Sequence, residues 1–333
     1  MDFKSGDTME ARFLNYPKQG KAELKSTQLP ALKHGEVLIK SLYSGISRGT
    51  ERLVYNGKIP ESEFDRMRCP HQRGEFSFPI SYGYQLVGEI LKTHENVNTR
   101  TIGNKVFLLH PHQDFVTVDE SAVNLLPRDV SLQRATLCAN METALNASWD
   151  GQLTAENKVL VVGAGVVGLL TAFVSQKMVS NPVTLVDTDE RKRVVAEQLG
   201  LSFVMPDSLN DDYDRIFHTT ANPHGLQMAL DHAAFEARLI EMSWYGDKPV
   251  TLTLGGTFHS KRLQIISSQV GHVSPSRRAT TTYKDRMGEA IQLLVDPRLD
   301  CLLEDAIAFE DLPDALNRVF DPEAAILSQV VAY

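Results

Sequence analysis

Hydrophobic residues in the first part of the chain come in short runs that turn residues interrupt. Runs at 36–40, 86–91, 105–109 and 115–118 each carry four to six residues between Gly, Pro and Asn positions, as strands do. Many short strands separated in this way are typical of a β-barrel or sandwich. The pattern from Ala11 to about Val130 therefore predicts a β-barrel-like domain.

The pattern changes near residue 158. The run 158–162 is continuously apolar, as expected for a parallel strand that is buried on both faces. A helical pattern at 166–179, a second buried strand at 182–186 and a charged helix at 189–199 follow it. Alternating strands and helices predict a doubly wound α/β domain. Its further elements are expected as strands at 215–218, 238–242 and 263–266 and a helix at 228–234.

The last part of the chain carries two helical patterns, at 283–295 and 312–320, and ends in an apolar strand at 329–333. The length of 333 residues suits two domains better than a single core.

Composition narrows the classes of function. Hydrophobic residues make up 42% and charged residues 23% of the chain, as in ordinary globular proteins, and the net charge of −8 argues against a nucleic-acid partner. The basic clusters at 191–193 and 277–278 are expected to be solvated faces. No apolar run approaches the ~20 residues of a membrane helix. The three cysteines form no CxxC pair and the chain opens without an apolar signal segment, so we expect a cytoplasmic location.

A glycine motif follows the first buried strand of the α/β region. Gly163, Gly165 and Gly168 fit GxGxxG between a strand and a helix. The first glycine permits a tight turn, the second lets backbone N–H groups approach a pyrophosphate, and the third lets helix and strand pack closely. Asp187 ends the next strand and is placed to accept hydrogen bonds from a ribose hydroxyl.

This motif predicts a nicotinamide dinucleotide site. Because Asp187 would repel a 2′-phosphate, NAD is favoured, while the nearby Arg191 and Lys192 leave NADP open. Thr219 and Trp244 follow later strands and are expected to lie near the cofactor, with plain packing as the rival interpretation. The expected cofactor-binding residues along the motif and after it are Gly163, Ala164, Gly165, Val166, Val167, Gly168, Asp187, Thr188 and Arg191.

Four further motifs carry a resemblance to a known family. They are Ser44-Gly-Ile-Ser-Arg-Gly-Thr-Glu51, Gly83-Tyr-Gln-Leu-Val-Gly88, Gly103-Asn-Lys-Val-Phe107 and Met141-Glu-Thr-Ala144. With the order of the parts, the chain resembles the medium-chain dehydrogenase/reductase family over essentially its whole length. Together with Leu-His-Pro-His-Gln at 109–113, the motifs look most like the branch that includes the bacteriochlorophyllide hydroxyethyl dehydrogenases.

The resemblance implies a domain organisation. A chaperonin-10-like β-barrel domain, residues 1–145 and 285–333, would carry the substrate site, and a Rossmann domain, residues 146–284, would bind the dinucleotide. It also implies a homodimer that pairs through the edge of the Rossmann domain, at about Val250–Leu254. Arg48 matches a family position that reaches the pyrophosphate, and Thr143 matches one that packs against nicotinamide.

The family's zinc ligands are replaced in this chain. Ser47 stands at the position of the first Cys, Tyr84 at that of the His and Gln85 at that of the neighbouring Glu. Cys138 lies near the third ligand position, but one thiolate cannot hold a tetrahedral zinc ion. We therefore expect no zinc. His110 and His112, which Pro111 separates, are expected to be loop histidines rather than a different metal site.

Without a metal, a side chain must polarise the substrate oxygen or take its proton. The expected catalytic residues are Tyr84, His110, Ser47 and Thr50. A histidine that titrates near neutral pH suits acid–base work. The rival interpretations are a Tyr84 that fills the vacated space, a structural His110 and hydroxyls of Ser47 and Thr50 that cap their loop. Glu51 is expected to pair with a nearby cation.

The sequence thus predicts a zinc-independent, NAD(P)(H)-dependent oxidoreductase that transfers hydride between nicotinamide and a small alcohol or carbonyl substrate. Two alternatives stay open. One is a quinone or enone reductase of the same family, and the other is a dinucleotide-binding protein without catalysis. His110 and Tyr84 argue for carbonyl chemistry against the first alternative.

Overall fold

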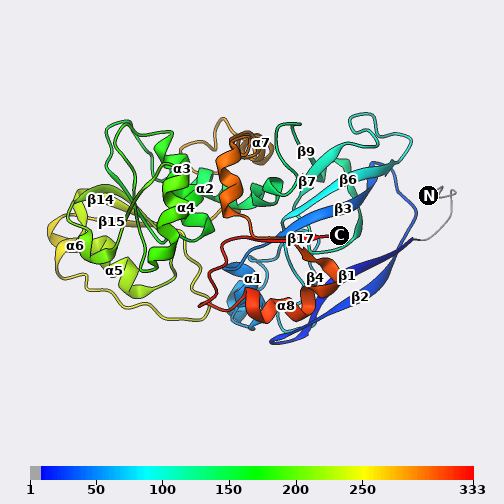
Figure 1. Cartoon of the computed structure of the whole chain (residues 1–333), viewed down its shortest axis with the longest axis horizontal. Helices are drawn as coiled ribbons and strands as arrows, with labels where there is room; N and C mark the ends of the chain where they lie inside the picture. The colour runs from blue at the N-terminus through cyan, green and yellow to red at the C-terminus, as the bar shows by residue number, and fades with distance from the viewer. Residues whose placement is uncertain (1–8) are drawn as a thin grey trace. The chain divides into compact units, whose positions relative to one another are not determined.

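The computed structural model describes residues 9–333, which form two compact units (Figure 1). The first unit holds the described residues up to Ala139 together with Leu303–Tyr333, and the second holds Asn140–Leu302. The polar start of the chain, residues 1–8, on which the expectation of no signal segment rests, lies outside the described residues. The predicted boundaries at 145/146 and 284/285 differ from this division, because most of α2 (Cys138–Asp150) and all of α7 (Tyr283–Leu293) go with the second unit.

A buried arginine explains why α7 stays with α2. Arg286 of α7 is 2% exposed, and its Nε donates to Glu142 Oε1 at 3.0 Å. Its Nη1 donates to Asn146 Oδ1 at 2.6 Å. Removing one partner of a buried ion pair leaves an uncompensated charge, which costs about 3–5 kcal/mol. The Arg286–Glu142 ion pair therefore fixes α7 on α2. The hydrophobic pattern of the sequence does not predict this contact.

The first unit is built from short, mostly antiparallel strands, as its pattern of short apolar runs predicts. One sheet has the order β2-β1-β5-β4, and a second has the order β16-β17-β3-β6-β7-β9, with β8 paired to β3. Alternate residues of β3, β6, β7 and β8 form one hydrophobic core, and the four strands predicted here are confirmed. The strands are β1 (Met9–Lys18), β2 (Lys21–Leu29), β3 (Glu36–Ile46), β4 (Arg73–Gly74), β5 (Ile80–Ser81), β6 (Leu86–Thr93), β7 (Lys105–Leu108), β8 (Phe115–Asp119), β9 (Asn124–Leu125), β16 (Ile307–Ala308) and β17 (Gln329–Ala332).

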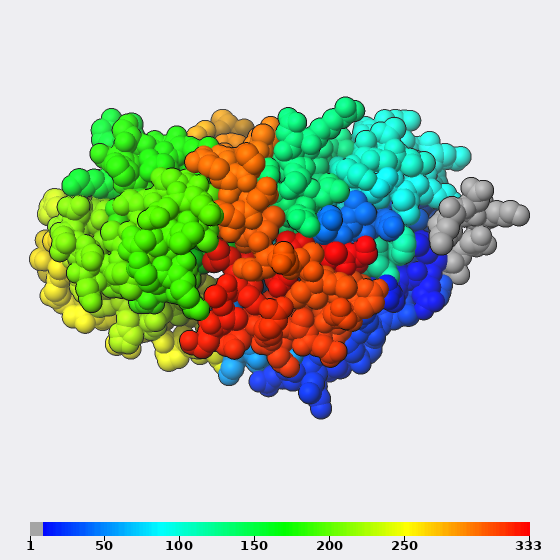
Figure 2. Space-filling model, in the orientation of Figure 1, coloured from blue at the N-terminus to red at the C-terminus, as the bar shows by residue number. Residues whose placement is uncertain are grey.

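The C-terminal segment returns to complete the first unit. β17 pairs antiparallel with the second half of β3, so the predicted final strand closes onto the barrel-like part. The helices of this unit are α1 (Thr50–Tyr55) and α8 (Leu312–Val319). The space-filling view shows α8 and the chain that follows it, in orange and red, at the surface of this unit (Figure 2).

The second unit contains a six-stranded, fully parallel sheet with the order β12-β11-β10-β13-β14-β15. The order reverses between β10 and β13, so the predicted doubly wound fold is confirmed. Its strands are β10 (Val159–Val162), β11 (Thr184–Val186), β12 (Ser202–Val204), β13 (Tyr213–His218), β14 (Ala233–Glu241) and β15 (Gln264–Ser267). Its other helices are α3 (Val166–Gln176), α4 (Arg193–Gln198), α5 (Pro223–Asp231) and α6 (Thr257–Ser260).

One expectation for this unit differs from the structure. The helix expected at 228–234 is α5, which begins earlier because the Asn222 side chain caps it, and Ala233 already starts β14. In the segment 250–254, Val250 and Leu252 pack against the hydrophobic core, and the dimer contact expected there stays a prediction. Within residues 9–333, no helix is both long and apolar enough to cross a bilayer.

Candidate functional site

The glycine turn joins β10 to α3 in the second unit. Gly163 has φ +107°, in the region that favours glycine, and its N–H donates to Val186 O at 2.8 Å. A Cβ on Gly168 would lie 1.8 Å from Gly163 O, so helix and turn can pack only with glycine there. A Cβ on Gly165 would meet no atom within 4 Å. The turn is therefore closed at Gly168 and open at Gly165, as an approaching pyrophosphate requires.

Asp187 is held against this turn. Its Oδ2 accepts from Ala164 N at 2.6 Å and from Lys192 Nζ at 2.9 Å, and its Oδ1 accepts from Asp189 N at 2.9 Å. Of the two basic residues that leave NADP open, Lys192 therefore contacts Asp187. Arg191 binds the carboxylate of Asp189 through Nε at 2.7 Å.

The other expected cofactor residues surround the turn or lie elsewhere in this unit. Val166 and Val167 start α3, whose N-terminal N–H groups suit a phosphate. Thr219 Oγ1 donates to Val162 O at 3.0 Å and so supports the turn from β13. The open glycine, the helix terminus and the carboxylate fit a dinucleotide. Exposed Thr188, half-buried Thr143 of α2 and half-buried Trp244 after β14 stay predictions.

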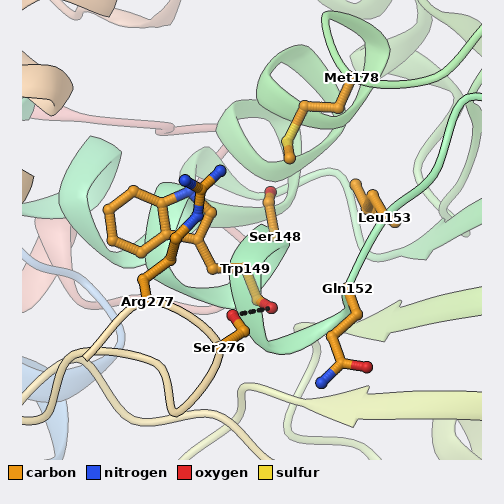
Figure 3. Close-up of a pocket in the computed structure, with 7 residues that line it drawn as sticks. All are labelled: Ser148, Trp149, Gln152, Leu153, Met178, Ser276 and Arg277. Atoms are coloured by element: carbon orange, nitrogen blue, oxygen red, sulfur yellow. Dashed lines mark hydrogen bonds between the residues drawn. The ribbon is translucent and has the colours of Figure 1, made fainter. Parts of the chain in front are cut away.

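The second unit has a small pocket near the C-terminal end of α3, whereas the glycine turn lies at the N-terminal end. The pocket measures about 210 Å³, and Arg277 lies over the Trp149 ring there at 5.5 Å (Figure 3). Ser276 Oγ donates to Trp149 O at 3.0 Å. Met178, which follows the C-terminus of α3, also lines the pocket, so an 11-residue helix, about 16 Å long, separates the pocket from the glycine turn. The expected solvated face at 277–278 is exposed.

In the first unit, three of the four expected catalytic residues come together. The Tyr84 hydroxyl donates to Ser47 Oγ at 2.6 Å, and it also bonds to Thr50 at the start of α1. Burial raises the pKa of Tyr84 to about 12, while the bonds to Ser47 and Thr50 act in the opposite direction. The phenol is therefore protonated at neutral pH and acts as a hydrogen-bond donor.

A buried polar chain supports Ser47. Ser47 N donates to Glu51 Oε1 at 2.8 Å, and Glu51 Oε2 lies 3.0 Å from His112 Nε2. His112 Nδ1 lies 2.7 Å from Ser44 Oγ, which is 2.9 Å from the Tyr333 hydroxyl. The partner of Glu51, for which a cation was expected, is thus His112, 61 residues further along the chain. The sequence predicted His112 as a loop histidine, and nothing in its spacing from His110 indicated Glu51 as its partner.

His110 does not join this group. Its Nδ1 bonds to Pro111 O at 2.8 Å, and its ring stacks on His71 at 5.0 Å. Among the described residues it makes no hydrogen bond to Tyr84, Ser47 or Thr50. Burial lowers the pKa of His110 to about 3. The expected titration near neutral pH is therefore wrong, and the imidazole is neutral under physiological conditions.

The Arg48 guanidinium donates hydrogen bonds to backbone carbonyls at the end of α8 and after it. Its Nε donates to Val319 O and its Nη2 to Asp321 O, both at 2.7 Å, and Nη1 bonds to Ile326 O. These carbonyls end α8 and follow it, so Arg48 fastens the C-terminal segment of the first unit. The expected reach to a pyrophosphate stays a prediction, which these contacts do not support.

The donor set at the family's metal positions does not fit zinc. The Ser47 and Tyr84 hydroxyls bond to each other, and Gln85 offers an amide instead of a carboxylate. Across residues 9–333, no group of three or more His, Cys, Asp or Glu side chains gathers where it would hold a metal ion. A structural or catalytic zinc site takes at least three such protein ligands.

Comparison with known proteins finds similarity to dehydrogenases. No protein-family model matches it. It is 24% identical over 229 residues to (R,R)-butanediol dehydrogenase of Bacillus subtilis, covering 61% of this chain and 64% of that protein. It is also 24% identical over 316 residues to 2-desacetyl-2-hydroxyethyl bacteriochlorophyllide A dehydrogenase of Cereibacter sphaeroides, covering 90% and 94%. The chain thus spans just under two thirds of the first relative and nearly all of the second.

Solved structures show the same fold. An alcohol dehydrogenase from Escherichia coli CFT073 in complex with NADH matches with a TM-score of 0.77 at 17% identity, covering 97% of this chain and 99% of that one. A dehydrogenase from Sinorhizobium meliloti 1021 bound to NADP matches with a TM-score of 0.79 at 14% identity, covering 98% and 100%. The expected pairing of a chaperonin-10-like domain with a Rossmann domain is confirmed.

Proposed function

We propose that the chain is a member of the medium-chain dehydrogenase/reductase superfamily and that it is a zinc-independent, nicotinamide-dependent oxidoreductase. Its relatives carry the names of dehydrogenases, and two structural neighbours bind NADH or NADP. We propose hydride transfer between nicotinamide and a small alcohol or carbonyl substrate. A homodimer and a cytoplasmic location stay predictions.

One observation carries the zinc-independent part of the proposal. The Tyr84 hydroxyl and Ser47 Oγ, at the positions of two family zinc ligands, lie 2.6 Å apart in a hydrogen bond. A bond of this length satisfies both hydroxyls, and neither is a ligand that zinc prefers in proteins. The site offers a hydrogen-bond donor to a substrate oxygen where relatives of the zinc type offer a Lewis acid.

The chain's own residues then handle the proton. When bound, nicotinamide supplies or accepts the hydride at a substrate carbon. Tyr84 holds a proton at its hydroxyl, because its pKa lies near 12. When substrate binds, this hydrogen turns from Ser47 Oγ to the substrate oxygen as charge develops there, and the Ser47 and Thr50 hydroxyls then donate to the phenol oxygen. Glu51 fixes Ser47 through its backbone N–H.

The proposed cofactor preference rests on Asp187. A carboxylate at the end of β11 accepts ribose hydroxyls and repels a 2′-phosphate, which favours NAD. Lys192, at 2.9 Å from the same carboxylate, offsets part of that repulsion. We therefore propose a preference for NAD with measurable binding of NADP.

Titration with the two reduced coenzymes tests the cofactor part. The protein is titrated with NADH and NADPH while nicotinamide fluorescence is followed. A lower Kd for NADH supports the role of Asp187. A lower Kd for NADPH shows that Lys192 dominates, and binding of neither contradicts the dinucleotide site.

A substrate panel tests the reaction type. Alcohols, aldehydes, ketones, enones and quinones are offered with the preferred coenzyme, and absorbance at the nicotinamide band is followed. Turnover of alcohols or carbonyls that Tyr84→Phe abolishes supports the proposal. Turnover restricted to enones or quinones, unaffected by Tyr84→Phe, supports the alternative of a double-bond reductase, which needs little acid–base machinery. Coenzyme binding without turnover supports a non-catalytic protein.

A further inference from the structure

A fully buried histidine ends the central strand β13 of the second unit. His218 has no exposed surface, although the other strand residues at this depth are apolar. β13 lies next to β10, where the strand order of the sheet reverses. Ligands of open α/β sheets bind outside the carboxyl ends of the strands at this point. His218 is therefore a titratable side chain beneath the place where a dinucleotide is expected.

One side of the imidazole is fixed by a carboxylate. His218 Nδ1 lies 2.8 Å from Glu241 Oε2, on the neighbouring strand β14. Glu241 also accepts from Ser243 N at 2.8 Å and from the Tyr245 hydroxyl at 3.2 Å. Because an ionised carboxylate only accepts hydrogen bonds, Nδ1 carries a hydrogen. The other ring nitrogen, Nε2, is then the acceptor of a neutral ring.

The other side of the imidazole meets an exposed hydroxyl. His218 Nε2 lies 2.7 Å from Thr220 Oγ1, and Thr220 is exposed at the carboxyl end of β13. Thr220 also touches the glycine turn, since a Cβ on Gly163 would lie 2.7 Å from Thr220 Cγ2. With a neutral ring, the hydroxyl of Thr220 donates inward, its Oγ1 accepts from Asn222 N at 3.2 Å, and one lone pair remains for a ligand.

We propose that Thr220 is a binding residue for the dinucleotide and that His218 is the positioning residue that aims its hydroxyl. The ligand group is a hydroxyl donor, for which the ribose nearest the glycine turn has the right chemistry. The inference rests on the proposed dinucleotide site, and it adds two residues that the glycine motif does not contain.

Two substitutions of His218 separate its two contacts. His218→Gln places an amide oxygen near the position of Nε2 and keeps the acceptor for Thr220. His218→Asn places an amide N–H near the position of Nδ1 and keeps the bond to Glu241 only. NADH and NADPH are titrated by fluorescence at one fixed pH, and the thermal unfolding midpoint of each variant is recorded.

The expected result is a split between the variants. His218→Asn raises the Kd of the preferred coenzyme roughly 3- to 10-fold, as for one lost hydrogen bond, whereas His218→Gln stays within about 2-fold of wild type. Thr220→Ala, at the surface, matches His218→Asn, and Thr220→Ser restores wild-type affinity. Ser148→Ala, which removes one buried hydrogen bond from α2, lowers the unfolding midpoint without changing Kd.

Three outcomes overturn the inference. Equal Kd in wild type, His218→Asn and Thr220→Ala contradicts it while leaving the dinucleotide site intact. Equal weakening by His218→Gln and His218→Asn, with Thr220→Ala unaffected, shows that His218 only supports the fold. A wild-type protein that binds neither coenzyme overturns the proposed function, and this inference with it.

Discussion

Two regions of the molecule are built in opposite ways. One is the glycine turn of the second unit, and the other is the Tyr84 cluster of the first unit, which consists of Ser47, Thr50, Glu51, Tyr84 and His112. The turn is local, because Gly163, Gly165 and Gly168 act within six consecutive residues and one strand-to-helix connection. The cluster is assembled over distance, since its hydrogen bonds join Tyr84 to Ser47 and Glu51 to His112. A local site can be recognised from spacing alone, whereas an assembled site can only be guessed from the identity of its parts.

The two regions also differ in what a substitution does. Gly163 and Gly168 of the turn are limited by backbone geometry and close packing, so even a methyl group there would cause strain or a clash, whereas Gly165 is open to a ligand. The cluster is limited by hydrogen bonding, so removal of a single hydroxyl leaves the shape intact and changes the chemistry. The predictions below use this difference.

The largest effect is expected at the turn. Gly168→Ala places a Cβ 1.8 Å from Gly163 O, so the helix must move and coenzyme binding and stability are both lost. Gly165→Ala places a Cβ where no protein atom lies within 4 Å, so the fold is kept while the approach of a pyrophosphate is blocked. Coenzyme titration and thermal unfolding of both variants measure this. Tight NADH binding by Gly165→Ala would show that the pyrophosphate does not bind at this turn.

Tyr84→Phe is expected to have the next largest effect. Loss of a proton donor at the substrate oxygen lowers kcat by about 100-fold or more, while Kd for NADH is unchanged because the turn is untouched. Ser47→Ala, which keeps the phenol but removes its acceptor, lowers kcat less. Steady-state kinetics on the best substrate of the panel measure both. Full turnover by Tyr84→Phe would show that Tyr84 only packs in the site and that its hydroxyl takes no part in the reaction.

The buried pair behind Ser47 is expected to matter for stability. His112→Leu leaves the fully buried Glu51 carboxylate without its partner, which costs about 3 kcal/mol of unfolding free energy. The double variant Glu51→Gln/His112→Leu recovers part of the loss, because a buried amide carries no charge. Denaturant unfolding measures both. A double variant that is less stable than His112→Leu would contradict an ionised Glu51.

The smallest effect concerns His110 and pH. Burial lowers its folded pKa to about 3, below the unfolded value of about 6.5, so the unfolded chain binds the extra proton as the pH falls between these values. The folded state therefore loses roughly 2 kcal/mol from this group between pH 6.5 and 5. His110→Gln removes that part of the slope. Denaturant unfolding at pH 5 and 7 compares the two proteins, and equal slopes would show an exposed, ordinary histidine.

Much of the fold could be predicted because its signals are periodic and local. The continuous apolar runs at 158–162 and 182–186 became β10 and β11, and the final run became β17. The predicted domain boundaries differ from the division into two compact units, because that division places α7 with α2, where Arg286 contacts Glu142 across 144 residues.

The candidate site divides in the same way. Spacing alone marked Gly163, Gly168 and Asp187. The resemblance brought Ser47 and Tyr84 to attention, and the structure joined them. Nothing in the sequence paired Glu51 with His112 or showed that burial holds His110 neutral, since both depend on which side chains surround them in space.

Metal dependence shows whether Tyr84 and Ser47 polarise the substrate oxygen in place of a zinc ion. The protein is dialysed against a strong zinc chelator, its metal content is measured by mass spectrometry, and turnover of the best carbonyl substrate is followed beside Tyr84→Phe. We predict unchanged turnover with less than about 0.1 metal ion per chain, and loss of turnover in Tyr84→Phe. Loss of wild-type turnover on dialysis, with recovery on adding Zn²⁺, would contradict the account.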